Sequence, residues 1–215
     1  MKNKITALIA SLFLILSFNT LQAETNFGIS LMTGQAETSG SEKEDGSADD
    51  KNTKSVKETF MGGSLYLEHV SDNGVAIGID YVPLEVELGD GKRTDSSAGA
   101  DAESEADTGD RKASASLENL ITLYASFPLN VGDLYGKVGY HMVDVTTSET
   151  LPNAAYGDDD ITGFQVALGK SFDRTKLEIF YSDFEEVSLT ATGGSGSHKI
   201  EADADVLGLK LSIDF

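Results

Sequence analysis

The last nine residues of the chain alternate strictly between two kinds of side chain. Leu207, Leu209, Leu211, Ile213 and Phe215 are apolar, and the residues between them are glycine, lysine, serine and aspartate. Because successive side chains of a β-strand point to opposite faces, this segment predicts a strand with one apolar and one polar face. A half-buried strand of a soluble protein has the same pattern, so this segment alone leaves open whether the apolar face meets a protein core or lipid.

The same alternation recurs along the chain in segments of strand length. Asn73-Gly74, ahead of a β-branched run, is a strong hairpin signal. After Pro83 the apolar alternation changes phase, which predicts a β-bulge there. Three connections are short (71–74, 128–133 and 173–175), whereas four are longer (35–59, 89–113, 147–159 and 193–198). An even number of strands with short turns at one end and longer loops at the other is typical of a transmembrane barrel. The sequence therefore predicts an all-β, eight-stranded antiparallel up-and-down transmembrane β-barrel, with strands at 26–34, 60–70, 75–88, 114–127, 134–146, around 164–169, around 177–182 and at 206–215.

Four phenylalanines share one position in this scheme. Phe27, Phe127, Phe172 and Phe215 all lie at the short-turn ends of their strands. Aromatic side chains at that level form the girdles of membrane barrels where lipid meets water. A soluble β-sandwich would account for single strands but not for this shared end-placement. We therefore predict a periplasmic aromatic girdle made of these four residues.

This pattern, ending at Phe215, resembles the small eight-stranded outer-membrane β-barrels of the OmpA transmembrane domain and OmpX types. The resemblance covers residues 24–215 and rests on strand count, loop asymmetry and the terminal phenylalanine, without a family-specific motif. It implies a monomeric barrel in the outer membrane whose apolar faces meet lipid. It also implies that the barrel assembly machinery recognises Phe215.

The N-terminus predicts export. Lys2 and Lys4 precede an apolar run from Ile5 to Phe18, and Leu21-Gln22-Ala23 forms a usable cleavage site. A retained membrane anchor is the alternative, but the run is short for a spanning helix. We expect residues 1–23 to be a signal peptide that is removed.

Charge and composition exclude several classes of function. Removal of Lys2 and Lys4 would change the formal net charge from −20 to −22, which disfavours binding to the phosphates of nucleic acid. The chain has no cysteine, so it forms no disulfide and no thiolate metal site. The acidic stretch 45–50 lacks the spacing and terminal glutamate of a calcium loop. We therefore expect no metal and no cofactor.

Two long polar tracts, 35–59 and 89–113, contain almost no apolar side chains. Such composition does not bury enough surface to fold on its own. We expect both tracts to form mobile, acidic extracellular loops.

The inward faces of the predicted strands carry charges of both signs. An eight-stranded barrel is about wide enough for side chains to fill, and charges confined there must pair. We predict a lumen ion-pair network, which favours a structural or surface-interaction role over the alternative, a narrow porin-like channel for small solutes. The members of this network are Glu68, Asp80, Lys137, Glu178 and Lys210.

Three histidines raise the question of catalysis. An acyl hydrolase or transferase needs a histidine beside a serine and an acidic residue. His69 lies at a turn, His141 within a strand and His198 in a Gly/Ser loop, and the sequence places none of them beside such a pair. We predict that the protein is not an enzyme.

Basic residues gather near the ends of the long connections. At the barrel rim they would lie level with lipopolysaccharide phosphates and make charge-assisted contacts. The predicted lipopolysaccharide contacts are Lys57, Lys92, Arg93, Arg111 and Lys112.

Overall fold

The computed structural model describes residues 24–43, 51–83, 85–95, 109–149, 156–190 and 199–215. The predicted signal peptide, 1–23, lies outside these residues. No helix in the described ranges is long and apolar enough to cross a membrane. The strands are β1 (Glu24–Lys43), β2 (Lys51–Val70), β3 (Ala76–Val82), β4 (Val86–Asp95), β5 (Gly109–Pro128), β6 (Leu134–Glu149), β7 (Asp159–Phe172), β8 (Thr175–Thr190) and β9 (Lys199–Asp214).

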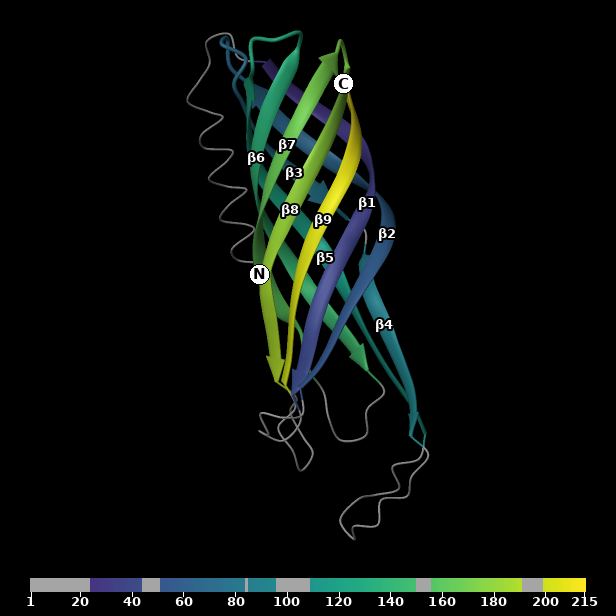
Figure 1. Cartoon of the computed structure of the whole chain (residues 1–215). Helices are drawn as coiled ribbons and strands as arrows, with labels where there is room; N and C mark the ends of the chain where they lie inside the picture. Colours follow the sequence, from purple (N-terminus) through teal and green to yellow (C-terminus); the bar gives the residue numbers. More distant parts are fainter. Residues whose placement is uncertain (1–23, 44–50, 84, 96–108, 150–155, 191–198) are drawn as a thin grey trace.

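The strands form one antiparallel sheet that closes on itself (Figure 1). β1 pairs with β2 on one side and with β9 on the other, and β5 to β9 pair in sequence order. β3 and β4 both pair with β5, so they are two parts of one interrupted strand and the wall has eight strands. This confirms the predicted all-β, eight-stranded antiparallel up-and-down barrel.

The interruption between β3 and β4 occurs at Pro83. Val82 pairs with Leu120 and Val86 pairs with Leu117, so four steps along this strand face three steps along β5. The extra residue is the bulge that the change of alternation after Pro83 predicts, and proline is tolerated there because it donates no ladder hydrogen bond.

The short turns gather at one end of the barrel, which we call the turn end; it is uppermost in Figure 1. In the first turn the Gly74 amide donates to the Ser71 carbonyl at 2.8 Å, and Gly74 has a φ of 78° that suits glycine. At the same end the Phe215 amide donates to the Phe27 carbonyl at 2.8 Å, which fixes the C-terminus against β1. The opposite end, toward which β1 runs, is the loop end.

The strands are longer than the sequence predicted. β1 continues to Lys43 and β2 begins at Lys51, so most of the tract 35–59 is a paired hairpin and its prediction as a loop was wrong. Likewise, β4 reaches Asp95 and β5 begins at Gly109, within the tract 89–113. Ladder hydrogen bonds to a neighbouring strand order polar sequence that has little apolar surface of its own. Residues 44–50 and 96–108 lie outside the described residues, and the mobility expected for them stays a prediction.

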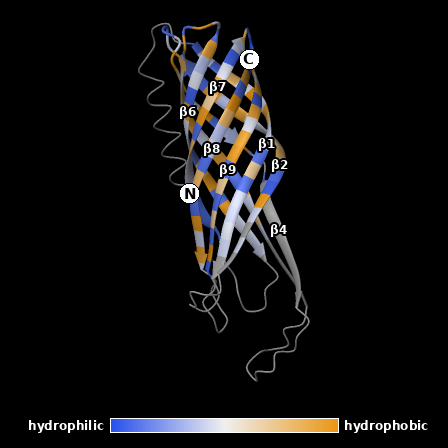
Figure 2. Ribbon diagram, in the orientation of Figure 1, coloured by the Kyte–Doolittle hydropathy of each residue, from blue (hydrophilic) through white to orange (hydrophobic). Residues whose placement is uncertain are grey.

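Two halves of the barrel differ in what they place inside and outside. At the turn end, apolar side chains such as Ile29, Leu177 and Leu209 are exposed on the outer face, and we call them the belt. Figure 2 shows hydrophobic and hydrophilic residues alternating along the strands in this part of the wall. At the loop end the apolar side chains are inside. They form one buried cluster comprising Ala36, Leu117, Val143, Val145, Ile161, Phe180, Phe184, Val187, Leu189, Ala204 and Val206.

Candidate functional site: the barrel interior

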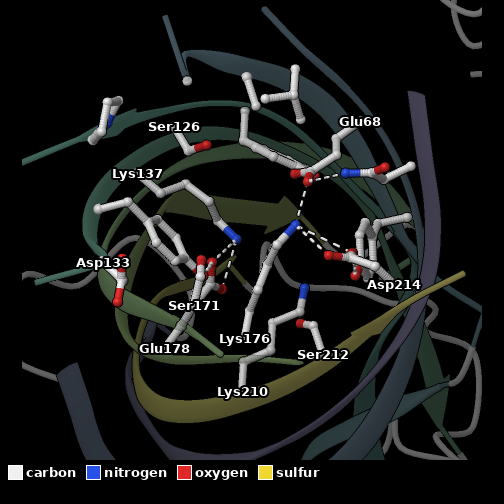
Figure 3. A pocket seen from close by; sticks show the side chains of 18 of the residues that line it. Glu68, Ser126, Asp133, Lys137, Ser171, Lys176, Glu178, Lys210, Ser212 and Asp214 are labelled. Atoms are coloured by element: carbon white, nitrogen blue, oxygen red, sulfur yellow. Dashed lines mark hydrogen bonds and ion pairs between the residues drawn. The ribbon is translucent and has the colours of Figure 1, made fainter. Parts of the chain in front are cut away.

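The interior of the turn end is a polar cavity of about 360 Å³. Alternation along each strand directs every second side chain into it, so residues from distant parts of the chain meet there. Figure 3 shows the lysine side chains reaching into this space from different parts of the wall. The cavity is lined mainly by tyrosines and charged residues, among them Tyr66, Glu68, Asp80, Tyr124, Tyr135, Lys137, Lys176, Glu178, Lys210 and Asp214.

Lys137 and Glu178 form a buried ion pair between β6 and β8. The Lys137 ammonium donates to both carboxylate oxygens of Glu178 at 2.7 Å, and both side chains are less than a tenth exposed. The Tyr135 hydroxyl donates to the same carboxylate at 2.9 Å, and the ammonium lies 4.7 Å from the ring centre of Tyr124. Every charged atom of this pair therefore has a partner, as burial of two charges requires.

Lys176 joins two further carboxylates near the mouth of the cavity. Its ammonium pairs with Glu68 and, at 3.2 Å, with Asp214. Tyr124 donates to the second oxygen of Glu68 at 3.1 Å, and Tyr66 donates to Asp214. Sequence reasoning did not select Lys176 or Asp214, although both lie on the polar side of the alternation that places Glu178 and Lys210 inside.

Lys210 and Asp80 form the third pair, which spans the lumen from β9 to β3. The structure therefore groups the five residues of the predicted network into Lys137–Glu178, Lys210–Asp80 and Glu68 with Lys176. Glu68 meets neither of the two lysines that the sequence pointed to.

A second, smaller cavity of about 60 Å³ lies further toward the loop end. Asp80, Tyr124, Lys137 and Lys210 line both cavities, so these side chains form a partition between them. Most of the remaining lining of the smaller cavity is apolar, including Met32, Phe60 and Leu120. The interior thus changes from charged to apolar across this partition.

A chain of neutral polar groups lies at the same level. His141 is 2.9 Å from the Ser182 hydroxyl through Nε2 and 2.8 Å from the Thr122 hydroxyl through Nδ1. Gln165 donates to Ser182 at 3.2 Å, and the His141 ring stacks on Phe184 with centres 5.0 Å apart. The sequence did not place His141 beside a serine; the register of β6 to β8 does so.

This row of polar side chains lacks the acidic member of a hydrolytic triad. Among the described hydrogen bonds of His141 the second partner is a threonine, not a carboxylate that would stabilise an imidazolium. His69 contacts Thr25 at 3.3 Å on the exposed surface, and His198 lies outside the described residues. Within the described ranges no group of histidine, aspartate and glutamate side chains is arranged to hold a metal ion.

The four phenylalanines selected from the sequence lie on the outer face at the turn end. Phe27, Phe127, Phe172 and Phe215 are 50%, 41%, 51% and 70% exposed, and the rings of Phe27 and Phe215 are 6.5 Å apart. These positions are compatible with a girdle at a membrane surface, which stays a prediction.

The basic residues selected for lipopolysaccharide lie toward the loop end. Lys57 is exposed and pairs with Glu37 at 2.8 Å. The backbone register sets Lys92 opposite Lys112 and Arg93 opposite Arg111 on the β4–β5 hairpin, whereas the positions of these four side chains lie outside what the structure describes. Their contact with lipopolysaccharide stays a prediction.

No known protein family and no curated protein matches this sequence. Among solved structures, Neisserial surface protein A is 9% identical, with 91% of this chain and 100% of that chain covered and a TM-score of 0.43. Ail of Yersinia pestis, in complex with a heparin analogue, is 15% identical over 88% and 99% of the two chains, with a TM-score of 0.39. The outer membrane protease OmpT of Escherichia coli is 11% identical over 92% and 99%, with a TM-score of 0.46. The assignment of the fold here rests on the strand pairing itself.

Proposed function

We propose that this protein is an integral outer-membrane β-barrel with a closed lumen and a structural or surface-interaction role. The observation that carries the proposal is the combination of an exposed apolar belt outside and buried, fully paired charges inside at the turn end. In a soluble protein the apolar belt would be exposed to water. In a membrane protein the bilayer covers the belt and does not contact the charged interior.

The closed lumen is supported by two layers in series. The partition, whose Lys137 pairs with Glu178 and whose Lys210 pairs with Asp80, crosses the interior. The apolar cluster that includes Val143 fills the interior further toward the loop end. Ions crossing such an interior would have to break buried pairs and then pass an apolar layer, both at high cost.

Planar-bilayer recording tests the closed lumen. We expect no stable, large conductance from the wild-type protein, because both layers block the path. A matched variant with Lys137→Gly, Phe180→Gly and Phe184→Gly removes side chains from both layers and should show that opening is detectable. Stable, large conductance from the wild type would overturn the closed lumen and favour the alternative, a narrow channel for small solutes.

The proposal includes two partners. Lipopolysaccharide would contact the basic positions near the loop end, so neutralising Arg93, Arg111 and Lys112 should weaken its co-purification. The barrel assembly machinery would recognise Phe215, which stands exposed beside Phe27. Deletion of Phe215 should therefore lower the amount of assembled barrel in cells more than Phe172→Ala does.

We propose no catalytic role. Among the described hydrogen bonds the Ser182–His141 pair has no acidic partner, and its two side chains are only 2% exposed. Lipid A deacylation or palmitoylation by the purified protein, abolished by Ser182→Ala, would contradict this proposal.

A further inference from the structure

The ladder between neighbouring strands has a gap in one place. β2 pairs with β3 from Val70, opposite Ala76, only as far as Leu65, opposite Tyr81. Beyond Leu65, β2 continues to Lys51 with β1 as its only partner, and β4 pairs only with β5. Within the described residues no ladder joins β2 to β4, and Figure 1 shows β4 diverging from β2 toward the loop end. We call this gap the seam.

The seam begins within the apolar belt. On its β2 side Leu65 and Met61 face outward, and Met61 is 82% exposed. Gly62, Gly63 and the buried Ser64 lie between them, so the edge of the wall carries little side-chain bulk at this point. The start of the seam is therefore largely apolar and has few bulky side chains. It lies at the height where the bilayer would contact the barrel.

The small apolar cavity lies directly inside this start. Phe60 and Gly62 line it from the β2 side, Val82 from the end of β3, and Leu117 and Leu120 from β5 behind β4. A Cβ added to Gly62 would come no closer than 3.8 Å to Met32, so the backbone leaves room here. Belt, seam and cavity thus form a mostly apolar route across the wall, with the buried Ser64 as the one polar residue of the β2 edge along it.

The charges along the seam favour a hydrocarbon chain over an added β-strand as the occupant. Further along, the unpaired edges carry Lys51, Lys54 and Lys57 on β2 and Lys92 and Arg93 on β4. Lysine on an edge strand is a common device against pairing with another chain. At the start of the seam, in contrast, the β2 edge from Leu65 to Phe60 carries no charge, and Ser64 is its one polar residue. On the other side of the gap, Pro83 and the exposed Glu85 lie between β3 and β4.

We propose that the tail of a membrane-lipid acyl chain enters the wall through the start of the seam and occupies the apolar cavity. This inference rests on the proposed position of the barrel in a membrane. A cavity of about 60 Å³ admits only the end of a chain, and the ester and headgroup stay in the surrounding bilayer. An apolar chain needs no hydrogen bond there and leaves the partition intact.

Because the chain contains no tryptophan, a single Phe60→Trp substitution gives one indole at the cavity. The variant is refolded into phosphatidylcholine vesicles whose chains carry bromine near the methyl end, which quenches indole on contact. We expect strong quenching. Adding Gly62→Leu, which fills the cavity, should reduce the quenching several-fold, whereas Val138→Leu on the outward face of β6, away from the seam, should leave it unchanged.

Two further variants keep the outcomes distinct. Leu209→Trp, on the outer belt away from its turn-end rim, should be quenched in every background; if it is not, the membrane position itself is wrong. If Gly62→Leu fails to fold, Ala36→Leu fills the same cavity from β1. Absent quenching of Phe60→Trp, or quenching that neither filling variant reduces, overturns the proposal while leaving the barrel in the membrane.

Discussion

The turn half and the loop half of this barrel use opposite arrangements of the same alternation. In the turn half Leu209 faces out and Lys210 faces in, whereas in the loop half Val143 faces in and Asp144 faces out. The loop half therefore has the interior of a soluble β-barrel, and the turn half has the reverse. One continuous wall therefore combines two opposite side-chain patterns. The pattern of the turn half suits surrounding lipid, which we propose for it, and the pattern of the loop half suits surrounding water.

The change between the halves is marked in the sequence by adjacent apolar residues. At each such pair one side chain belongs to the outer belt and the other to the interior, as in Met142-Val143, where Val143 is fully buried. One strand therefore keeps its period of two while the apolar face moves from outside to inside. The pairs are Leu31-Met32, Phe60-Met61, Met142-Val143, Phe180-Tyr181 and Val206-Leu207.

The largest expected effect concerns the charged interior of the turn half. Lys137→Ala leaves the buried Glu178 carboxylate without its cation and should cost about 4 kcal/mol of unfolding free energy. The measurement is urea unfolding of the refolded barrel in lipid vesicles, followed by the heat-dependent shift in gel mobility.

The matched control replaces the pair as a unit. Lys137→Met with Glu178→Gln removes both charges but keeps an acceptor for the Tyr135 hydroxyl, so most of the stability should return. An equal loss in the single and double variants would mean that packing, not charge, governs this layer.

The unfolding free energy of the loop half should depend instead on its buried apolar volume. Phe184→Ala removes a buried ring that stacks on His141 and should cost about 3 kcal/mol through the cavity it leaves. The same unfolding assay applies. Asp183→Ala, one residue away on the exposed face, should change stability by less than about 0.5 kcal/mol; if both substitutions behave alike, the loop half has no core.

The strand count, the pairing of neighbours and the bulge at Pro83 followed from the sequence because each depends on local alternation and turn residues. Partners across the lumen did not. Lys210 reaches Asp80 rather than Glu68 because β9 and β3 lie on different parts of the wall, and their relative height depends on the stagger of every strand between them.

The lengths of the strands were missed for a related reason. The segment from Gln35 to Lys43 is polar on its outer face and shows little apolar signal, yet it pairs with both β2 and β9. Its order comes from two neighbours that lie elsewhere in the sequence. The adjacent pair Leu31-Met32 was the available signal that the strand continues beyond the belt.

A charge on the outer face should distinguish the halves directly. Leu209→Arg places a cation in the belt and should cost about 2 kcal/mol if lipid surrounds it. Asp203→Arg, six residues away on the exposed outer face of the same strand, should be close to neutral. Unfolding midpoints in vesicles measure both effects. If Leu209→Arg leaves the midpoint unchanged, lipid does not surround the turn half.

The smallest effect concerns acidic pairs just beyond the belt. Asp144 on β6 faces Asp160 on β7 across the ladder. Partial burial, together with the hydrogen bond and charge of Asp160, raises the pKa of Asp144 against the lowering effect of Asn119. A carboxyl whose folded pKa is raised stabilises the fold at low pH and loses that contribution as pH rises through the folded pKa.

Asp160→Asn should therefore stabilise the barrel by about 0.5 kcal/mol at pH 7, because it removes a like charge directly opposite another. The gain should shrink as pH falls through the raised pKa of Asp144, since both versions then carry a neutral carboxyl at position 144. Asp72→Asn, in the exposed turn 71–74 outside the paired strands, provides the control and should show neither the gain nor its pH dependence. A gain that persists at low pH would assign the effect to hydrogen bonding rather than to charge, and the loop half would then tolerate its outward acids without electrostatic cost.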